Sequence, residues 1–242
     1  MTKSGREKRV SKTNKIIKET LMRTVAFILF FALSNLVYAN DPKSASPLNT
    51  AANASYLSPL EKEIVYEINL FRSNPAQYAE KYIAPLAKNY HKNILQYPGD
   101  KPIKTVEGVK ALHECVRELK NATPKPILYP NIALTKAADD HCRDQSKSGR
   151  TGHIGSDKST LKTRIERYGK WNVRIAENIA YGNTSARQMV IFLLIDDNVK
   201  NRGHRINMLN PDFKLIGVST ATHPEYLTMC VMDFAGGMAE DN

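Results

Sequence analysis

Two histidines stand in segments where an imidazole ring could take part in chemistry. His153 lies in the glycine-rich stretch 149–157 (GRTGHIGSD), and His204 follows a glycine in RGHRIN. Glycine lets a backbone turn tightly and approach other groups closely, so we expect a shaped loop to hold the His153 ring. Glu177 is a third candidate, because it places a carboxylate in the apolar run 175–181 (IAENIAY), where an uncompensated charge is costly.

Two aspartates, Asp196 and Asp197, precede His204 at the end of an apolar segment, and either could point back to the same cavity. Two neutral imidazoles with one or two carboxylates are donors that suit zinc or another divalent ion. The same groups could instead form a hydrogen-bonded histidine–carboxylate network without metal. A third interpretation is purely structural, with a histidine that braces its loop and a glutamate that binds backbone amides. The residue types leave all three open.

The sequence shows none of the common catalytic signatures. It has no G-x-S-x-G elbow, no H-E-x-x-H helix and no phosphate-binding loop. Ser156 lies between a glycine and an aspartate, a context that predicts a turn residue rather than a nucleophile. His141 shares a helical spacing with Leu134 and Ala138, which predicts a packed side chain rather than a ligand.

The elements that must position these groups are helices in the first part of the chain and strands near its end. Ser58, Pro59 and Glu61 form a capping box that begins the first helix, and Ser73-Asn74-Pro75 interrupts and restarts it. Residues 89–104 are expected to be irregular. Periodicity predicts helices over 60–71, 75–86, 106–120, 131–149, 159–168 and 186–195, and strands over 175–181, 215–220 and 226–234.

The strand at 175–181 determines where its carboxylate points. Side chains alternate along a strand, so Glu177 shares one face with the apolar residues, while Asn178 lies on the other face with two alanines. The last two strands join as a hairpin around His223-Pro224. Helices followed by a small sheet predict one α/β domain with helices on the faces of the sheet.

The N-terminus is typical of an export signal. Residues 24–39 (TVAFILFFALSNLVYA) are apolar, follow a basic region and end in V-Y-A, so we expect a signal peptide at 1–39, with Met22 as an alternative start of translation. An uncleaved N-terminal membrane anchor is the other interpretation; after cleavage no span remains. Residues 40–57 are expected to be a flexible tether before a domain at 58–242. The expected location is therefore secreted or periplasmic.

Charge and cysteine content exclude several classes of protein. The formal net charge is +11, but residues 1–39 hold eight basic and two acidic residues, and the remaining 27 basic and 22 acidic residues leave only +5. A charge this small gives little support for binding nucleic acid or an anionic membrane. The three cysteines cannot all pair within the chain and are too few for a disulfide scaffold, so the apolar core must supply the stability.

Six short segments carry a resemblance to a known family. In chain order they are 68–75 (INLFRSNP), 134–145 (LTKAADDHCRDQ), 152–157 (GHIGSD), 177–182 (ENIAYG), 203–207 (GHRIN) and 229–235 (MCVMDFA). Together they resemble the CAP superfamily, or SCP domain, which includes cysteine-rich secretory proteins, insect venom antigens and plant pathogenesis-related proteins. The branch found in bacteria and protists is the most similar. The resemblance covers about residues 57–237.

The resemblance implies an α–β–α sandwich with a small, mostly antiparallel central sheet and a cleft lined by two histidines and two acids. Carried over by position, the implied metal ligands are His153, Glu177, Asp197 and His204, with Asp196 as the alternative for the second acid. Further implied cleft-lining residues are Asp196, Asn178, Arg205 and Ser156. The chain departs from the pattern at Lys158, where close relatives have glycine, and at Thr220, where many have a cysteine that pairs with the equivalent of Cys230.

The family's range of functions gives two main hypotheses. The first is a non-catalytic, exported binding module whose cleft holds a divalent ion, with zinc expected first, and contacts a lipid, a peptide or an envelope or host component. The alternative is a metal-dependent, protease-like hydrolase in which Glu177 or Asp197 serves as base and the ion lowers the pKa of a bound water. A fold supports many activities, so the resemblance fixes the architecture better than the function.

Overall fold

The computed structural model of the protein describes residues 46–239, so the predicted signal peptide and residues 40–45 of the predicted tether lie outside the described residues. Residues 47–239 belong to one unit. Its helical segments are α2 (Pro59–Ser73), α3 (Pro75–Tyr78), the π-helical η1 (Ala79–Ile83), the 3-10 helix η2 (Ala84–Asn89), α4 (Val109–Asn121), α5 (Ile132–Ser148), α6 (Leu161–Ile165), α7 (Ala186–Ile195) and α8 (Gly203–Leu209). Among the described residues, no helix has the length and apolar character needed to cross a membrane.

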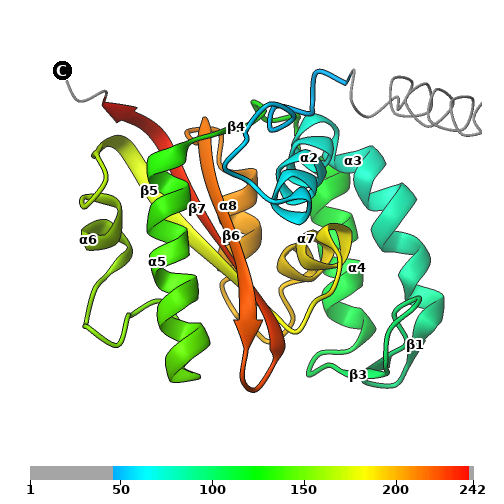
Figure 1. Cartoon of the computed structure of the whole chain (residues 1–242). Helices are drawn as coiled ribbons and strands as arrows, with labels where there is room; N and C mark the ends of the chain where they lie inside the picture. The colour runs from blue at the N-terminus through cyan, green and yellow to red at the C-terminus, as the bar shows by residue number, and fades with distance from the viewer. Residues whose placement is uncertain (1–45, 240–242) are drawn as a thin grey trace, which may run out of the picture. The chain divides into compact units, whose positions relative to one another are not determined.

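The main sheet has four strands in the order β4-β6-β7-β5, with bounds Tyr129–Pro130, Leu215–His223, Leu227–Ala239 and Lys170–Tyr181 (Figure 1). β4 runs parallel to β6, and the other neighbours are antiparallel. Three two-residue strands, β1 (Tyr90–His91), β2 (Ile94–Leu95) and β3 (Ile103–Lys104), form a separate small sheet. Because β5 ends the order of the main sheet, it is an edge strand.

Helices cover both faces of the main sheet, as the α–β–α prediction requires. On one face α5 packs against β6 and β7, and apolar residues of α5, β5 and β7 form a cluster there. Gly217 in β6 permits this close packing, because a Cβ there would lie 2.1 Å from the backbone carbon of Leu134 in α5. On the other face lie α2, α7 and α8, which carry the larger core.

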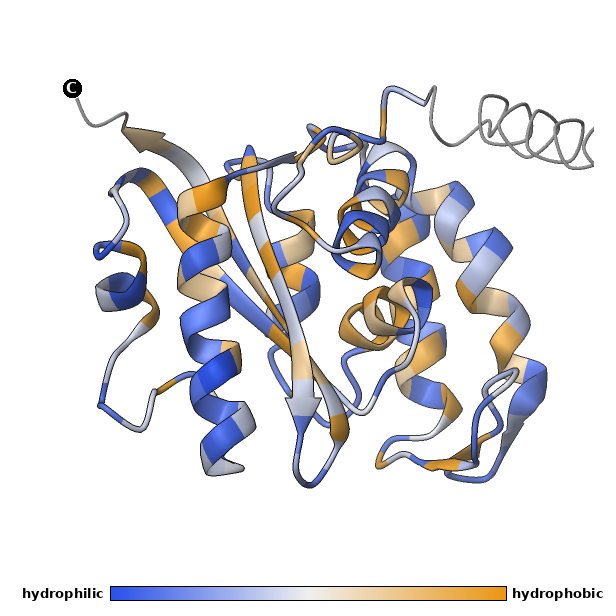
Figure 2. Ribbon diagram, in the orientation of Figure 1, coloured by the Kyte–Doolittle hydropathy of each residue, from blue (hydrophilic) through white to orange (hydrophobic). Residues whose placement is uncertain are grey.

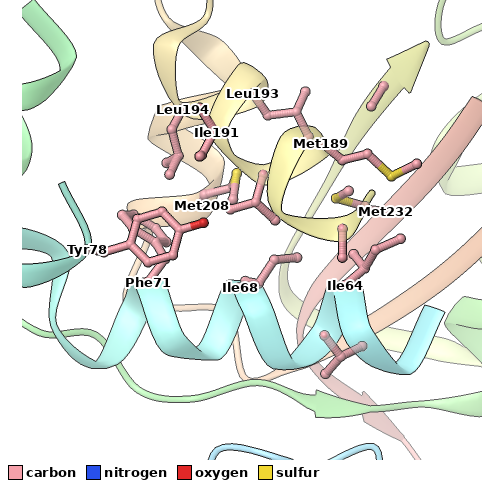
Figure 3. Close-up of a cluster of buried hydrophobic side chains, with 14 of the residues drawn as sticks. Ile64, Ile68, Phe71, Tyr78, Met189, Ile191, Leu193, Leu194, Met208 and Met232 are labelled. Atoms are coloured by element: carbon pink, nitrogen blue, oxygen red, sulfur yellow. The ribbon is translucent and has the colours of Figure 1, made fainter. Parts of the chain in front are cut away.

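The larger core is built from the apolar stripe that the sequence predicts in α2. Ile64, Ile68 and Phe71 lie on one side of α2 and face Met189 and Met208 across the core (Figure 3). All five are buried. α7 is apolar over most of its length, as Figure 2 shows by its orange colour, because it packs against both α2 and α4. Burial of these side chains is the main stabilising contribution.

The helix ends follow the sequence signals. Ser58 and Glu61 form the predicted capping box of α2, and Asn74 caps α3 where the chain was expected to restart its helix. α5 begins after Asn131, whose side chain accepts a hydrogen bond from Leu134 N, and ends at Gly149 in the left-handed conformation with φ 67°. These caps satisfy backbone groups that a helix end would otherwise leave unpaired.

Several elements differ from the expectation. β5 begins at Lys170 and contains a bulge between Asn172 and Ile175, so it is longer than the predicted strand. The helix α8 and the two-residue strand β4 were not expected, because seven residues and two residues are too short to show a periodic pattern. Residues 47–57, expected to be tether, pack on the domain, since Ala51 and Leu57 are buried.

The cysteines of the described residues are all free and buried. Thr220 in β6 lies directly opposite Cys230 in β7. The threonine therefore occupies the cross-strand position at which a cysteine could have paired with Cys230.

Candidate functional site

The candidate site is organised around two consecutive residues of the edge strand β5. Glu177 and Asn178 are both buried, and because they are neighbours in a strand, their side chains point to opposite faces of the sheet. Glu177 contacts His153, and Asn178 donates from Nδ2 to the backbone oxygen of His204 at 3.1 Å. The structure thus brings the two histidines to the same short stretch of β5, one from each face.

The first contact is a histidine–carboxylate pair. His153 Nδ1 lies 2.8 Å from Glu177 Oε1, and the His153 side chain is 55% exposed while that of Glu177 is 2% exposed. The carboxylate therefore holds one ring nitrogen from within the protein. Since Nδ1 is engaged, Nε2 is the ring nitrogen left for a ligand outside.

Arg164, which the sequence analysis did not single out, completes the surroundings of Glu177. It comes from α6 and donates from Nη2 to Glu177 Oε2 at 2.6 Å, with both side chains almost fully buried. It also donates to the backbone oxygens of His153 at 3.2 Å and Ser159 at 3.1 Å, which ties the histidine loop to α6. Burial acts to raise the pKa of Glu177, but the His153 hydrogen bond and the charge of Arg164 outweigh it, so the pKa lies below its usual value.

A network from α5 and β5 fixes the loop immediately before His153. The backbone oxygen of Gly152 lies 2.8 Å from His141 Nε2 and 2.5 Å from Gln145 Nε2. The backbone nitrogen of Gly152 donates to the hydroxyl of Tyr181 at 3.0 Å, and that hydroxyl donates to Gln145 Oε1 at 2.7 Å. His141 is therefore a buried structural residue, as its helical spacing predicts.

Asp233 is a buried acid in β7 next to the Glu177 of this first pair. It is the cross-strand partner of Glu177 in β7, it is fully buried, and its two carboxylate oxygens have no hydrogen-bond partner among the described residues. Burial first, and then the negative charge of Glu177, raise the pKa of Asp233 well above its usual value. The buried position of Asp233 beside Glu177 therefore favours the protonated form of Asp233.

The second contact pairs His204 with Asp196. His204 Nδ1 lies 2.6 Å from Asp196 Oδ1, and the backbone nitrogen of His204 donates to Asp196 Oδ2 at 3.0 Å. Asp196 ends α7 in the left-handed conformation with φ 57°, which turns its side chain back toward α8. Asp197, the expected second acid, instead accepts hydrogen bonds from the backbone nitrogens of Val106 at 2.7 Å and Glu107 at 2.9 Å. The contact with the histidine is thus made by Asp196, the alternative.

Two arginines hold this second pair against α4. Arg205 is fully buried and donates to the backbone oxygens of Leu194 at 2.6 Å and Ile195 at 3.1 Å, the two residues before Asp196. Arg202 donates to the backbone oxygen of Asp196 at 2.7 Å. Both guanidinium groups also contact Glu114 of α4. Arg205 was expected to line the cleft, but its side chain positions the backbone around Asp196.

The remaining predicted residues have structural contacts. Asn178 accepts from Asn207 Nδ2 at 2.9 Å and so connects β5 to α8. Ser156 bonds to Asp144 through both its backbone nitrogen, at 2.8 Å, and its hydroxyl. This contact agrees with the expectation that Ser156 is a turn residue.

A pocket of about 280 Å³ opens beside the second pair. One wall holds His204 and Asp196, and another is formed by the end of β5 from Ile179 to Tyr181. His153 and Glu177 do not line it. The other lining side chains are mostly apolar and come from the β1–β3 segment and from α7, among them Tyr90, Leu95, Ile103, Phe192, Leu193 and Ile195.

The donor set has one feature in common with protein metal sites. Metal-binding histidines usually direct their second ring nitrogen to a carboxylate, and both His153 and His204 do so. The acids contact the Nδ1 side of the rings, and both carboxylate oxygens of Glu177 are already bound, one to His153 and one to Arg164. Within residues 46–239, no three or more histidine, cysteine, aspartate or glutamate side chains form a group that could hold a metal ion. The two imidazoles therefore each leave Nε2 as a possible donor to an ion.

Together the fold and these contacts define an α/β domain with two histidine–carboxylate pairs on either side of one edge strand. A family model described as the cysteine-rich secretory protein family, CAP, matches residues 65–234, and the chain belongs to this family. This confirms the resemblance carried by the six sequence segments. A search of curated proteins finds no match.

The solved structures that match the chain include proteins from three bacteria. An outer surface protein from Borrelia burgdorferi is 19% identical, with a TM-score of 0.39, covering 51% of this chain and 86% of that chain. An extracellular protein containing an SCP domain from Bacillus anthracis is 21% identical, with a TM-score of 0.38, covering 51% and 37%. A cysteine-rich secretory protein from Staphylococcus aureus is 15% identical, with a TM-score of 0.36, covering 66% and 48%. The chain thus spans less than half of the last two proteins.

Proposed function

We propose that the protein is an exported, non-catalytic binding module in which His153 and His204 hold one divalent ion, with zinc as the expected metal. The observation that carries the proposal is the pair of Nδ1 contacts to buried carboxylates, which leaves Nε2 of each ring as the donor. The two rings would share the ion across the open edge of β5. The ion would supply a Lewis-acidic point at which an oxygen or nitrogen of a ligand can bind.

The pocket beside His204 supports a ligand with an apolar part, such as a lipid, a peptide or an envelope component. Its walls are mostly apolar, and His204 and Asp196 stand together in one of them. A ligand could therefore bury an apolar group in the pocket and direct a polar group toward the histidine. Two exposed apolar side chains, Ile154 and Ile206, follow the two histidines closely in the sequence.

The contacts of Glu177 favour binding over catalysis. A general base needs a free carboxylate oxygen within reach of the proton that it removes. Both oxygens of Glu177 are bound, and Arg164 stabilises its ionised form. These contacts make Glu177 a positioning residue for His153.

An exported location is proposed from the predicted signal peptide and from family membership.

Zinc titration by calorimetry tests the metal proposal with matched variants. The wild-type protein should bind about one zinc ion, and His153→Ala combined with His204→Ala should abolish the heat of binding. Asp196→Asn should weaken binding about 10- to 100-fold, because carboxylates behind a metal-binding histidine have effects of this size. Asp197→Asn is the control and should leave the affinity within about threefold, since its carboxylate accepts from the backbone nitrogens of Val106 and Glu107 rather than from His204. Zinc binding that survives loss of both histidines would refute the proposal.

A further inference from the structure

The pocket beside His204 contains a buried amide that makes no contact of its own within the protein. Asn183 lies two residues after the end of β5, is 6% exposed and lines the pocket. Its backbone oxygen accepts a hydrogen bond from the hydroxyl of Thr228 at 2.7 Å, but its side-chain amide has no hydrogen-bond partner among residues 46–239. The amide atoms are not among the fully buried atoms that lack a partner, so they keep contact with solvent, and the pocket is the hollow that Asn183 lines. An asparagine amide offers a ligand both a donor and an acceptor.

Two further polar side chains of the pocket are available to a ligand. Lys104 of β3 is exposed, and no acid in the described part of the chain forms an ion pair with it. Tyr90 of β1 also lines the pocket, and its hydroxyl donates to no group between residues 46 and 239. Burial first, and then the charge of Asp197, raise the pKa of Tyr90 to about 12, so the hydroxyl is a neutral donor at pH 7.

The two aspartates of the pocket are already engaged. Asp196 contacts the ring and the backbone nitrogen of His204, and Asp197 accepts two backbone hydrogen bonds from the segment before α4. One lysine and two aspartates give the pocket a net charge of −1, and the divalent ion of the proposed function would change it to +1. The ion-loaded pocket therefore favours a ligand with a carboxylate, for which Lys104 is the unpaired cation.

The size and the walls of the pocket limit what it can hold. Pockets that enclose a whole drug-sized ligand measure about 300–1,000 Å³, and this one measures about 280 Å³. It therefore suits one group of a larger ligand rather than a long acyl chain. A hydrocarbon chain would also cover the amide of Asn183 without bonding to it, and a polar group that is buried without a hydrogen bond destabilises the complex.

We propose that the pocket holds the C-terminal residue of a peptide. Such a residue carries an apolar side chain, an amide and a carboxylate close together, which are the three groups that the pocket can bind. The side chain would lie against the apolar walls, the amide would bind Asn183, and the carboxylate would bind Lys104. This inference rests on the proposed function, because it places the ligand beside the ion at His204, and it selects a peptide from the ligand classes considered there.

The probe is the peptide N-acetyl-alanyl-alanyl-leucine, titrated by calorimetry into the zinc-loaded protein. Three analogues each lack one group. A C-terminal amide removes the carboxylate, serine in place of leucine removes the apolar side chain, and dodecanoate keeps a carboxylate and a hydrocarbon chain but has no amide. Each analogue should bind about tenfold more weakly than the peptide, the effect expected when one hydrogen-bonded or apolar contact is lost.

Matched variants test the two polar contacts separately. Lys104→Met should weaken binding of the peptide about tenfold and leave the affinity of its amidated analogue within about twofold, because the variant removes only the partner of the carboxylate. Lys101→Met is the control and should change neither affinity by more than about twofold, since Lys101 is exposed in the same segment but does not line the pocket. Asn183→Leu should weaken binding of the peptide and strengthen binding of dodecanoate. Thermal melting verifies that each variant is folded.

The outcomes separate a peptide from a lipid and this inference from the metal proposal. Tighter binding of dodecanoate than of the peptide would assign the pocket to a lipid and overturn the inference. Equal affinities for the peptide and its amidated analogue, or no peptide binding at millimolar concentration, would overturn it as well. If zinc binds and the peptide does not, only the peptide inference fails. If zinc does not bind, the proposed function fails, and the same peptide comparisons on the metal-free protein decide the peptide inference.

Discussion

Replacing Arg164 with methionine removes the cation that faces Glu177 and keeps a side chain of similar length. The two side chains are 1% and 2% exposed, so solvent cannot compensate for the lost partner. Leaving one member of a buried ion pair without its partner destabilises a protein by about 3–5 kcal/mol. For a domain of this size that corresponds to a loss of roughly 6–20 °C in melting temperature.

The pH dependence of this loss follows from Glu177. In the wild type its pKa lies below the usual value, so the ion pair stabilises the folded state above that usual value and loses its effect as the pH falls. In Arg164→Met, burial raises the pKa of Glu177 and the carboxylate takes up a proton more readily. The difference between variant and wild type should therefore be largest at pH 7 and shrink toward pH 4.

Urea denaturation at pH 7 and pH 4 measures both effects. The double variant Arg164→Met with Glu177→Leu is the control, because removing both charges should restore most of the stability at pH 7. A loss below about 1 kcal/mol in Arg164→Met would show that the buried pair is not an important contribution. An equal loss at the two pH values would show that Glu177 is not the group left without a partner.

Two further predictions concern other buried polar groups. Asp233→Asn should change stability by less than about 1 kcal/mol at pH 4, because a neutral amide replaces a neutral acid of the same shape. The pKa of Asp233 is raised in the folded state, so this group lowers the stability of the wild type as the pH rises above about 3.9, and the variant lacks this effect. Urea denaturation at pH 4 and pH 7 should therefore show that the variant gains stability relative to the wild type as the pH rises. A large loss of stability in the variant at both pH values would contradict this. Arg72→Met should lose about 3 kcal/mol or more, because the buried guanidinium donates to the backbone oxygens of Pro126, Met208, Asn210 and Phe213. Thermal melting should show only partial recovery in Arg72→Lys, and full recovery would mean that the branched donor geometry is unimportant.

The sequence predicts those parts of the fold that depend on local chemistry. Ser58, Asn131 and Gly149 lie where the helices begin or end, because caps are satisfied by residues next to them in the chain. The apolar stripe of α2 and the face of β5 that carries Glu177 follow from simple periodicity. His153 and Glu177 could be brought together in advance because the family resemblance placed both in one cleft.

The contacts that surround these residues depend on the tertiary structure and could not be predicted in the same way. Arg164 lies in a five-residue helix, and nothing in its local sequence indicates that it crosses to β5. The choice between Asp196 and Asp197 is decided by one left-handed residue at the end of α7, which directs adjacent side chains to different partners. A weak signal existed, since an acid directly after an apolar helix occupies its C-terminal cap and can turn back.

A crystal structure of the zinc-loaded protein, with the ion located by anomalous scattering at the zinc edge, is the decisive test of the shared metal site. We predict a single ion at about 2.0–2.1 Å from Nε2 of both His153 and His204. Glu177 and Asp196 should remain on the Nδ1 side of the rings, outside bonding distance of the metal. An ion bound to one histidine alone, or bound at other residues while the two imidazoles stay apart, would contradict the proposed role of the two histidines.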